Sequence, residues 1–337
     1  MKFPRRLIPV LFACLAGIAP AYAETFFVPP ETDAAIARGL DYFRKRLDAG
    51  QPLGDGAFRN NPAVTALVGM AFLSSGSTPL DGPDAAYVQI CLDRLLAQSQ
   101  PGGVIAPTGL SGQPLMYGHG FAVLFLAECY GMSPQDEKIR PVLDAAVSVI
   151  LQAQNPRGGW RYTLRPFEED VSVTSCMTVA LRACRNAGIE VPSEAMEKAL
   201  AYLKTCQNPD GGFRYREMAG PSAWPRTAAV LAALCSAGVY DEDEIAQGLR
   251  YLNATSAELR PDDGYYPYAV YYAAQAYWLC DLPEFPWKSW YTQTSRVLAE
   301  RQKPNGSWSS AVSTDYATAM TLIVLQVPNN SLPIFQR

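Results

Sequence analysis

The chain has 337 residues, of which 49% are hydrophobic, a net charge of −4 and a pI near 5.2. This composition is ample for a large buried core. It offers no basic excess for binding nucleic acid or an anionic membrane surface, so we expect no nucleic-acid partner.

Residues 1–23 predict a signal peptide. Arg5 and Arg6 give the segment a charged start, and residues 7–20 are almost wholly apolar. Small residues up to Ala23 then complete a cleavage pattern. The apolar run is short for a membrane span, which makes an uncleaved anchor the weaker alternative. We expect cleavage near Ala23, a periplasmic or secreted monomer, and no transmembrane segment.

Internal repetition is the main signal in the rest of the chain. Segments that join a glutamine to a glycine-rich turn recur at 51–58, 100–104, 154–160, 207–213 and 302–308, and an aromatic residue closes all of them except 100–104. From Gln51, the glutamines are spaced by 49, 54, 53 and then 95 residues. The last spacing is two periods, and the missing turn falls at 253–265. The chain therefore predicts six repeats of about fifty residues.

Each repeat holds two helical patterns around its turn. Helices before the turn, such as 33–48, 136–153 and 193–206, are amphipathic and highly charged. Helices after the turn carry two charges at most, and they cover 63–75, 120–130, 171–187, 222–237, 266–280 and 313–327. A helix that is apolar nearly all round must be surrounded by protein. The pattern predicts an all-α fold of two concentric rings, with the apolar helices inside.

The turn residues predict structural roles. An Asn-Pro-x-Gly-Gly stretch ends the first helix, and the following aromatic residue packs on its own repeat. The glutamine side chain satisfies backbone groups at neighbouring helix ends. The tail, 328–337, follows the last repeat, and its apolar part at 332–335 is expected to close the ring by lying over it.

The cysteines left after signal cleavage are odd in number: Cys91, Cys129, Cys176, Cys184, Cys206, Cys235 and Cys280. The odd count and the lack of a C-x-x-C motif argue against a fully paired disulfide framework. Most are expected to be small buried residues, with one or two bridges left open.

The Q-x-x-x-G-x-W turns resemble the QW repeats of squalene-hopene and oxidosqualene cyclases and the looser repeats of protein prenyltransferase β subunits. The resemblance covers about 32–327 and implies an (α/α)6 toroid of six two-helix repeats over 24–327. It also implies a central cavity near the N-termini of the inner helices. A closer resemblance, at 117–120, 170–174, 316–320 and 332–337, is to squalene-cyclase-like proteins of uncharacterised function in Planctomycetes-type bacteria. That one implies no mechanism.

The chemistries of these families are not matched by the chain. Class II terpene cyclases protonate an alkene with the middle acid of a D-x-D-D-T segment. The best match, 170–174, keeps Asp170 but has Ser172 in the place of the acid. The zinc ligands of prenyltransferases are also missing, because the chain has no D-x-C segment and its one histidine, His119, does not lie in a late repeat. A site from His119, Asp170 and Cys176 is the remaining zinc alternative, and we expect no metal and no cofactor.

The inner-helix N-termini, if they ring one mouth, define a ligand site of aromatic, polar and charged residues. The candidates are His119, Asp170, Ser172, Trp224, Arg226, Tyr265, Tyr266, Tyr268, Tyr272, Asp315 and Tyr316. Positive helix ends there favour an anionic group. Asp170 and Asp315 are also the catalytic candidates, or alternatively N-caps. The tyrosines either contact a ligand or pack the centre, and His119 is alternatively a hydrogen-bonded structural residue.

Three functions remain open. The first is an exported binding protein with an unknown small molecule, glycan, peptide or lipid in its central cleft. The second is a divergent enzyme that acts on terpenoid-like or saccharide substrates through Asp170, Asp315 or a tyrosine. The third is a structural component of the cell envelope.

Overall fold

The computed structural model describes residues 28–107, 115–240 and 243–336. The predicted signal peptide and its cleavage site at Ala23 lie outside these residues. The described residues form α-helices and short 3-10 turns and no strand, so the all-α prediction is confirmed.

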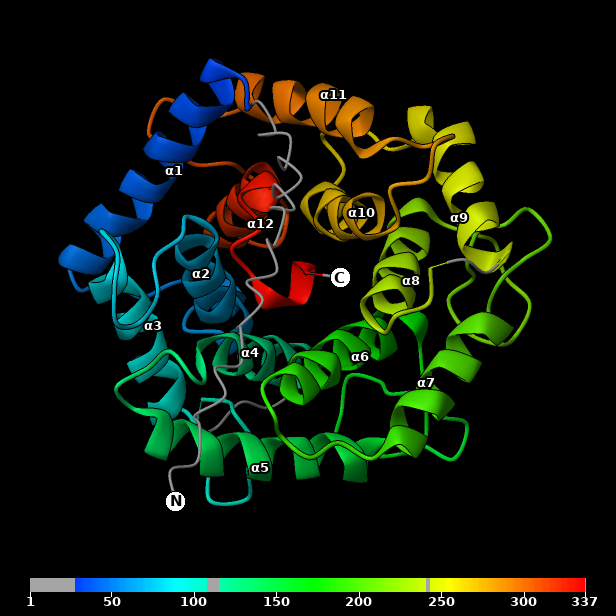
Figure 1. The fold of residues 1–337 in the computed structure, drawn as a ribbon, viewed down its shortest axis with the longest axis horizontal. Helices are drawn as coiled ribbons and strands as arrows, with labels where there is room; N and C mark the ends of the chain where they lie inside the picture. Colours follow the sequence, from blue (N-terminus) through cyan, green and yellow to red (C-terminus); the bar gives the residue numbers. More distant parts are fainter. Residues whose placement is uncertain (1–27, 108–114, 241–242, 337) are drawn as a thin grey trace, which may run out of the picture.

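The helices alternate between two rings (Figure 1). The outer ring consists of α1 (Pro30–Asp48), α3 (Ala85–Ala97), α5 (Asp136–Ala153), α7 (Ser193–Thr205), α9 (Asp243–Ala254) and α11 (Trp287–Glu300). The inner ring consists of α2 (Pro62–Ser74), α4 (Leu115–Cys129), α6 (Val171–Asn186), α8 (Trp224–Ser236), α10 (Tyr266–Cys280) and α12 (Thr314–Gln326). The 3-10 turns are η1 (Gly56–Phe58), η2 (Ser256–Glu258), η3 (Val327–Asn329) and η4 (Pro333–Phe335).

The burial of the side chains agrees with the inner and outer rings that were predicted from the charge of each helix. Nearly every residue of α2 and α12 is buried, whereas α1 buries one stripe that includes Ala35, Leu40, Phe43 and Leu47. Each inner helix contacts the next, and α12 contacts α2, so the inner ring closes. The predicted arrangement of charged helices outside and apolar helices inside is confirmed.

The repeat glutamines join one repeat to the next. In the third, fourth and sixth repeats the glutamine donates from Nε2 to the glycine carbonyl four residues on, and to a carbonyl near the start of the following outer helix. The pairs are Gln154 with Gly158 and Ala195, Gln207 with Gly211 and Glu244, and Gln302 with Gly306 and Ala35. The last set ties the sixth repeat to α1, so the same bond that links neighbours also closes the ring.

The glycine and the aromatic residue of the turn complete this joint. Gly306 has φ +87°, and a Cβ there would lie 2.3 Å from the carbonyl oxygen of Arg38 in α1. The indoles of Trp160 and Trp308 each donate 2.7 Å to a carbonyl of their own outer helix, at Ile150 and Leu298. Both the packing of the aromatic residue and the capping role of the glutamine are confirmed.

The C-terminal tail covers one end of the ring. Figure 1 shows η4 in the middle of the inner helices. Leu332, Ile334 and Phe335 are buried, and the Trp278 indole donates 2.9 Å to the Phe335 carbonyl. The expectation that this segment closes the toroid is therefore confirmed, at the end where the inner helices terminate.

One disulfide, Cys235–Cys280, joins α8 to α10. The free thiols among the described residues are buried: Cys91, Cys129, Cys176, Cys184 and Cys206. No described helix is both long enough and apolar enough to cross a membrane.

Substituting Gly306 with Ala should weaken ring closure. A Cβ would strain the left-handed backbone, at a cost of about 1 kcal/mol, and would also push α1 away from the turn. We expect the free energy of unfolding to fall by about 3 kcal/mol, measured by urea denaturation. Gly188, at φ +74° with no atom within 4 Å of its Cβ position, is the matched control, and Gly188→Ala should cost only the backbone strain. Equal losses in the two variants would contradict the closing role of Gly306.

Candidate functional site

Asp170 stands at the start of α6 and is the central residue of the candidate site. Its Oδ1 accepts hydrogen bonds from the backbone N–H groups of Ser172 and Val173, both at 2.9 Å, so it is the N-cap of the helix. The side chain is fully buried, and Oδ2 has no hydrogen-bond partner. Burial raises the pKa of Asp170 to about 6, although the two N-cap bonds, Arg161 and Tyr215 lower it.

Two long loops lie beside this carboxyl group, one between Trp160 and α6 and the other between Phe213 and α8. Their tyrosines, Tyr162 and Tyr215, share a hydrogen bond of 2.6 Å between hydroxyl oxygens. The Tyr215 carbonyl also accepts from the first N–H of α6, at Val171, at 3.1 Å. The loops are thereby held to each other and to the helix that carries Asp170.

Arginines flank the two phenol rings. The guanidinium groups of Arg226 and Arg216 lie 5.8 Å and 5.7 Å from the centre of the Tyr215 ring. Arg161 lies 5.4 Å from the centre of the Tyr162 ring. The Nε atoms of Arg226 and Arg216 are buried without a hydrogen-bond partner. Burial lowers the pKa of Arg226, which remains a cation at neutral pH.

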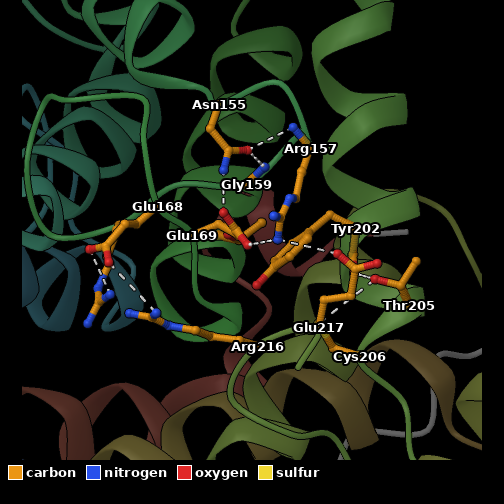
Figure 2. Close-up of polar contacts among 12 residues, drawn as sticks. Asn155, Arg157, Gly159, Glu168, Glu169, Tyr202, Thr205, Cys206, Arg216 and Glu217 are labelled. Atoms are coloured by element: carbon orange, nitrogen blue, oxygen red, sulfur yellow. Dashed lines mark hydrogen bonds and ion pairs between the residues drawn. The ribbon is translucent and has the colours of Figure 1, made fainter. Parts of the chain in front are cut away.

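An ion-pair network fixes the outer side of the loops (Figure 2). The buried Glu169 carboxylate accepts from the Asn155 side chain and pairs with Arg157 at 3.0 Å. Arg157 reaches Glu217 in the second loop at 3.5 Å. Glu168 pairs with Arg161 at 2.8 Å and with Arg216 at 3.8 Å. Because these pairs cross from one loop to the other, the loops form one structural unit.

The tyrosines of α10 divide into a mouth group and a packing group. Tyr268 is half-buried, and its hydroxyl group has no hydrogen-bond partner. Tyr272 is buried and packs edge-on against both Tyr268 (4.8 Å between ring centres) and Tyr271 (4.9 Å). Burial raises the pKa of Tyr268 and of Tyr117, at the start of α4, so both phenols are neutral at physiological pH.

His119 belongs to α4, and its side chain reaches α5. Its Nδ1 accepts from the N–H of Ile105 and its Nε2 donates to the carbonyl of Ala146, both at 3.1 Å. The side chain is fully buried, which lowers its pKa to about 4. Thr174 makes the equivalent bond to Trp160 N in the next repeat, at the same separation of 14 residues. His119 therefore has the hydrogen-bonded structural role that the sequence offered as its alternative.

A zinc site from His119, Asp170 and Cys176 does not fit this geometry, because both histidine nitrogens are bound to the backbone. Across residues 28–107, 115–240 and 243–336, no three His, Cys, Asp or Glu side chains are placed to hold a metal ion.

Asp315 faces the outer ring instead of the mouth. Its Oδ1 accepts from the Tyr42 hydroxyl at 2.8 Å, and its Oδ2 accepts from Gly54 N at 2.7 Å and pairs with Arg46 at 3.2 Å. Both oxygens are therefore used to join α12 to α1. The N-cap alternative for Asp315 is wrong, because Ser313 caps α12.

The remaining predicted residues lie around the rim. The Trp224 indole donates to the Leu252 carbonyl at 3.0 Å and ties α8 to α9. Tyr265 is 70% exposed, whereas Tyr266 and Tyr316 are buried at the starts of α10 and α12. The structure thus brings together Asp170, Ser172, Arg226 and Tyr268.

Tyr162 and Tyr215 belong to this group but were missed at the sequence level. A signal was present: repeats three and four both read Gly-Gly-aromatic-Arg-Tyr after the turn, at 158–162 and 211–215.

A groove of about 650 Å³ lies beside the Gln207 turn. Arg214 there donates to the carbonyls of Thr205, Arg216 and Glu217, among others. Asp210 accepts from Gly212 N and the Ser222 hydroxyl. These side chains hold the loop in place, so the groove has no free polar anchor comparable with Asp170.

Known structures share this architecture. A crystal structure of a protein from Actinoplanes matches with a TM-score of 0.62 at 16% identity, over 89% of this chain and 99% of that one. A variant of the type II terpene cyclase MstE from Scytonema, in complex with the substrate geranylgeranyl dihydroxybenzoate, matches with a TM-score of 0.59 at 16% identity, over 90% and 98%. The chain has the fold of the type II terpene cyclases.

At the level of sequence, 124 residues are 32% identical to squalene–hopene cyclase of Bradyrhizobium diazoefficiens. This match covers 33% of the chain and 18% of the cyclase. No protein-family model matches. The predicted (α/α)6 toroid with a squalene-cyclase-like fold is confirmed. At 16% identity, the solved structures establish the fold alone.

The buried Asp170 carboxylate should lower the free energy of unfolding at neutral pH, where it is ionised. Its pKa is higher in the folded protein (about 6) than the ordinary 3.8, so the folded state loses stability as the pH rises between these values. Asp170→Asn keeps an N-cap and removes the buried charge, and should therefore stabilise the protein at pH 7 by up to about 3 kcal/mol. The gain should vanish at pH 3.5, as measured by urea denaturation at both pH values.

Asp315→Asn is the matched control, because that carboxylate is fully partnered. Removing the Asp315 carboxylate in this variant should destabilise the protein by about 2–4 kcal/mol at pH 7. If both variants lose stability to a similar extent at pH 7, then Asp170 is a structural carboxylate like Asp315.

Proposed function

We propose that the protein binds a ligand at the mouth formed by the starts of α4, α6, α8 and α10. The observation that carries this proposal is a group of buried polar atoms without partners: Asp170 Oδ2, Arg216 Nε, Arg226 Nε and the Tyr268 hydroxyl. Each such atom costs about 1–3 kcal/mol, and folded proteins keep few of them. A ligand that reaches them would recover that cost.

The chemistry of these atoms favours a polar ligand. Asp170 Oδ2 accepts a hydrogen bond and Arg226 Nε donates one, so a ligand hydroxyl or amide group satisfies both. Glycans and peptides carry such groups, whereas the hydrocarbon part of a lipid leaves them unsatisfied. The positive ends of the inner helices add an attraction for an anionic substituent.

Acid catalysis at the same place is the second candidate. Asp170 combines a free oxygen with a pKa of about 6, the range in which a carboxyl group can both give and take a proton near neutral pH. MstE, with the same fold, was solved with a terpenoid substrate. The D-x-D-D acid and the zinc ligands are missing from this chain, so its chemistry would depend on Asp170 and the hydroxyl pair of Tyr162 and Tyr215.

We expect a polar ligand to copurify with the protein and to be identified by native mass spectrometry after release. Its affinity, measured by calorimetry, should fall at least about tenfold in Arg226→Gln, which removes a donor of the mouth. Arg250→Gln, an exposed arginine on α9, is the matched control and should bind normally. Equal affinity in both variants would rule out this mouth as the binding site.

Asp170→Asn separates the candidate functions, because it keeps an N-cap but cannot give up a proton. Loss of turnover with retained binding supports an enzyme, and loss of binding supports a receptor. If neither changes, the third function, a structural envelope component, is favoured.

Export forms part of the proposal. It is supported by the signal-peptide pattern up to Ala23 and by the Cys235–Cys280 disulfide, which persists in an oxidising compartment. The mature protein should be found outside the cytoplasm and should begin at Glu24, as checked by cell fractionation and intact mass. A cytoplasmic full-length chain would refute this part.

A further inference from the structure

The tail residues 332–335 fill the centre of the ring, called the lumen, at the end where the inner helices terminate, opposite Asp170 at the start of α6. The 3-10 turn η4 contacts α6 and α10, and Figure 1 shows it at the centre of the inner ring. Its bonds to Glu128 and Trp278 place it near the C-terminal ends of α4 and α10. Leu332, Ile334 and Phe335 are buried there. Asn329 and Asn330, which connect them to the last repeat, are exposed. The apolar residues 332–335, called the plug, are therefore joined to the last repeat by an exposed segment.

The ring holds this plug by its backbone. Glu128 Oε2 accepts from the N–H of Ile334 at 3.3 Å, and the Trp278 indole donates to the carbonyl of Phe335 at 2.9 Å. Side chains that bind main-chain groups, together with a cavity for apolar side chains, are features of sites for extended peptides. The contacts would be available to any chain segment with a similar pattern.

Glu128 is an unusual residue to find beside an apolar plug. It is 3% exposed, at the C-terminal end of α4. The groups around it that can titrate are the thiols of Cys129 and Cys184 and the phenol of Tyr271. Thiols and phenols carry no positive charge in either protonation state, so none of these groups compensates a charge on Glu128.

We propose that this lumen is a binding site for an extended apolar peptide, filled here by the chain's own residues 332–335, with Glu128 as the latch. The occupant is a peptide supplied in trans that carries the tail pattern Leu-Pro-Ile-Phe. It replaces the tail when the tail is released at its exposed connection.

Glu128 gives the latch a pH dependence. Burial raises its pKa to about 8, so the carboxyl group is mostly neutral at pH 7. Above pH 8 it ionises, and a buried unpaired carboxylate is costly. Departure of the tail lets water reach the carboxylate, so the tail should be released more readily at pH 9 than at pH 7.

The test uses the full-length chain and a fluorescent peptide of sequence SLPIFQR. The double variant Ile334→Asp, Phe335→Asp should free the lumen and bind the peptide at least about tenfold more tightly than the wild type at pH 7, measured by fluorescence anisotropy. A peptide with aspartates at the same two places is the control and should not bind. Equal weak binding to both proteins would overturn the proposal.

A second measurement does not depend on the folding of that variant. Amide hydrogen exchange of residues 332–336, corrected for the intrinsic effect of pH, should show about tenfold weaker protection at pH 9 than at pH 7 in the wild type. Glu128→Gln cannot ionise and should keep its protection at both pH values. The same pH effect in both proteins would show that Glu128 is not the latch.

Discussion

Ring closure is the constraint on which the rest of this structure depends. Each inner helix is apolar nearly all round, so it is stable only when neighbours cover every side. An open row of repeats would leave α2 and α12 each with an uncovered face, and the contact between them removes both faces at once. Gln302 and Gly306 make the joint with α1 that their equivalents make between neighbouring repeats. The same local turn motif therefore both links neighbouring repeats and helps to close the ring.

Two buried aspartates show how much the same residue type changes with its partners. Asp315 satisfies both oxygens with Tyr42, Gly54 and Arg46 and so fastens the closure. Asp170 satisfies one oxygen at the helix end and leaves the other without a partner. A carboxylate kept buried and half-satisfied lowers stability, and such a cost is typical of a site selected for binding or chemistry. This contrast is the physical reason for centring the site on Asp170.

The fold could be predicted from the sequence because the fold is periodic. Spacing of the glutamines predicted the repeats, and the absence of charge predicted which helices lie inside. The mouth was predictable only in part, since helix starts are visible in the sequence but side-chain direction is not. Asp315 and Asp170 occupy similar sequence positions, yet one points to α1 and the other to the loops. Nor could spacing show that Glu128 meets Ile334, 206 residues away, because that contact depends on the path of the tail.

The two ends of the ring differ in their electrostatics as well as their contents. Inner helices present partial positive charge at their N-termini, where Asp170 caps α6, and partial negative charge at their C-termini, where Glu128 ends α4. Burial disfavours the ionised form of both carboxyl groups, but two backbone N–H bonds help Asp170 and one long bond helps Glu128. The pKa values, about 6 and about 8, follow this order. One end thus suits a polar ligand, and the other suits an apolar chain beside a neutral acid.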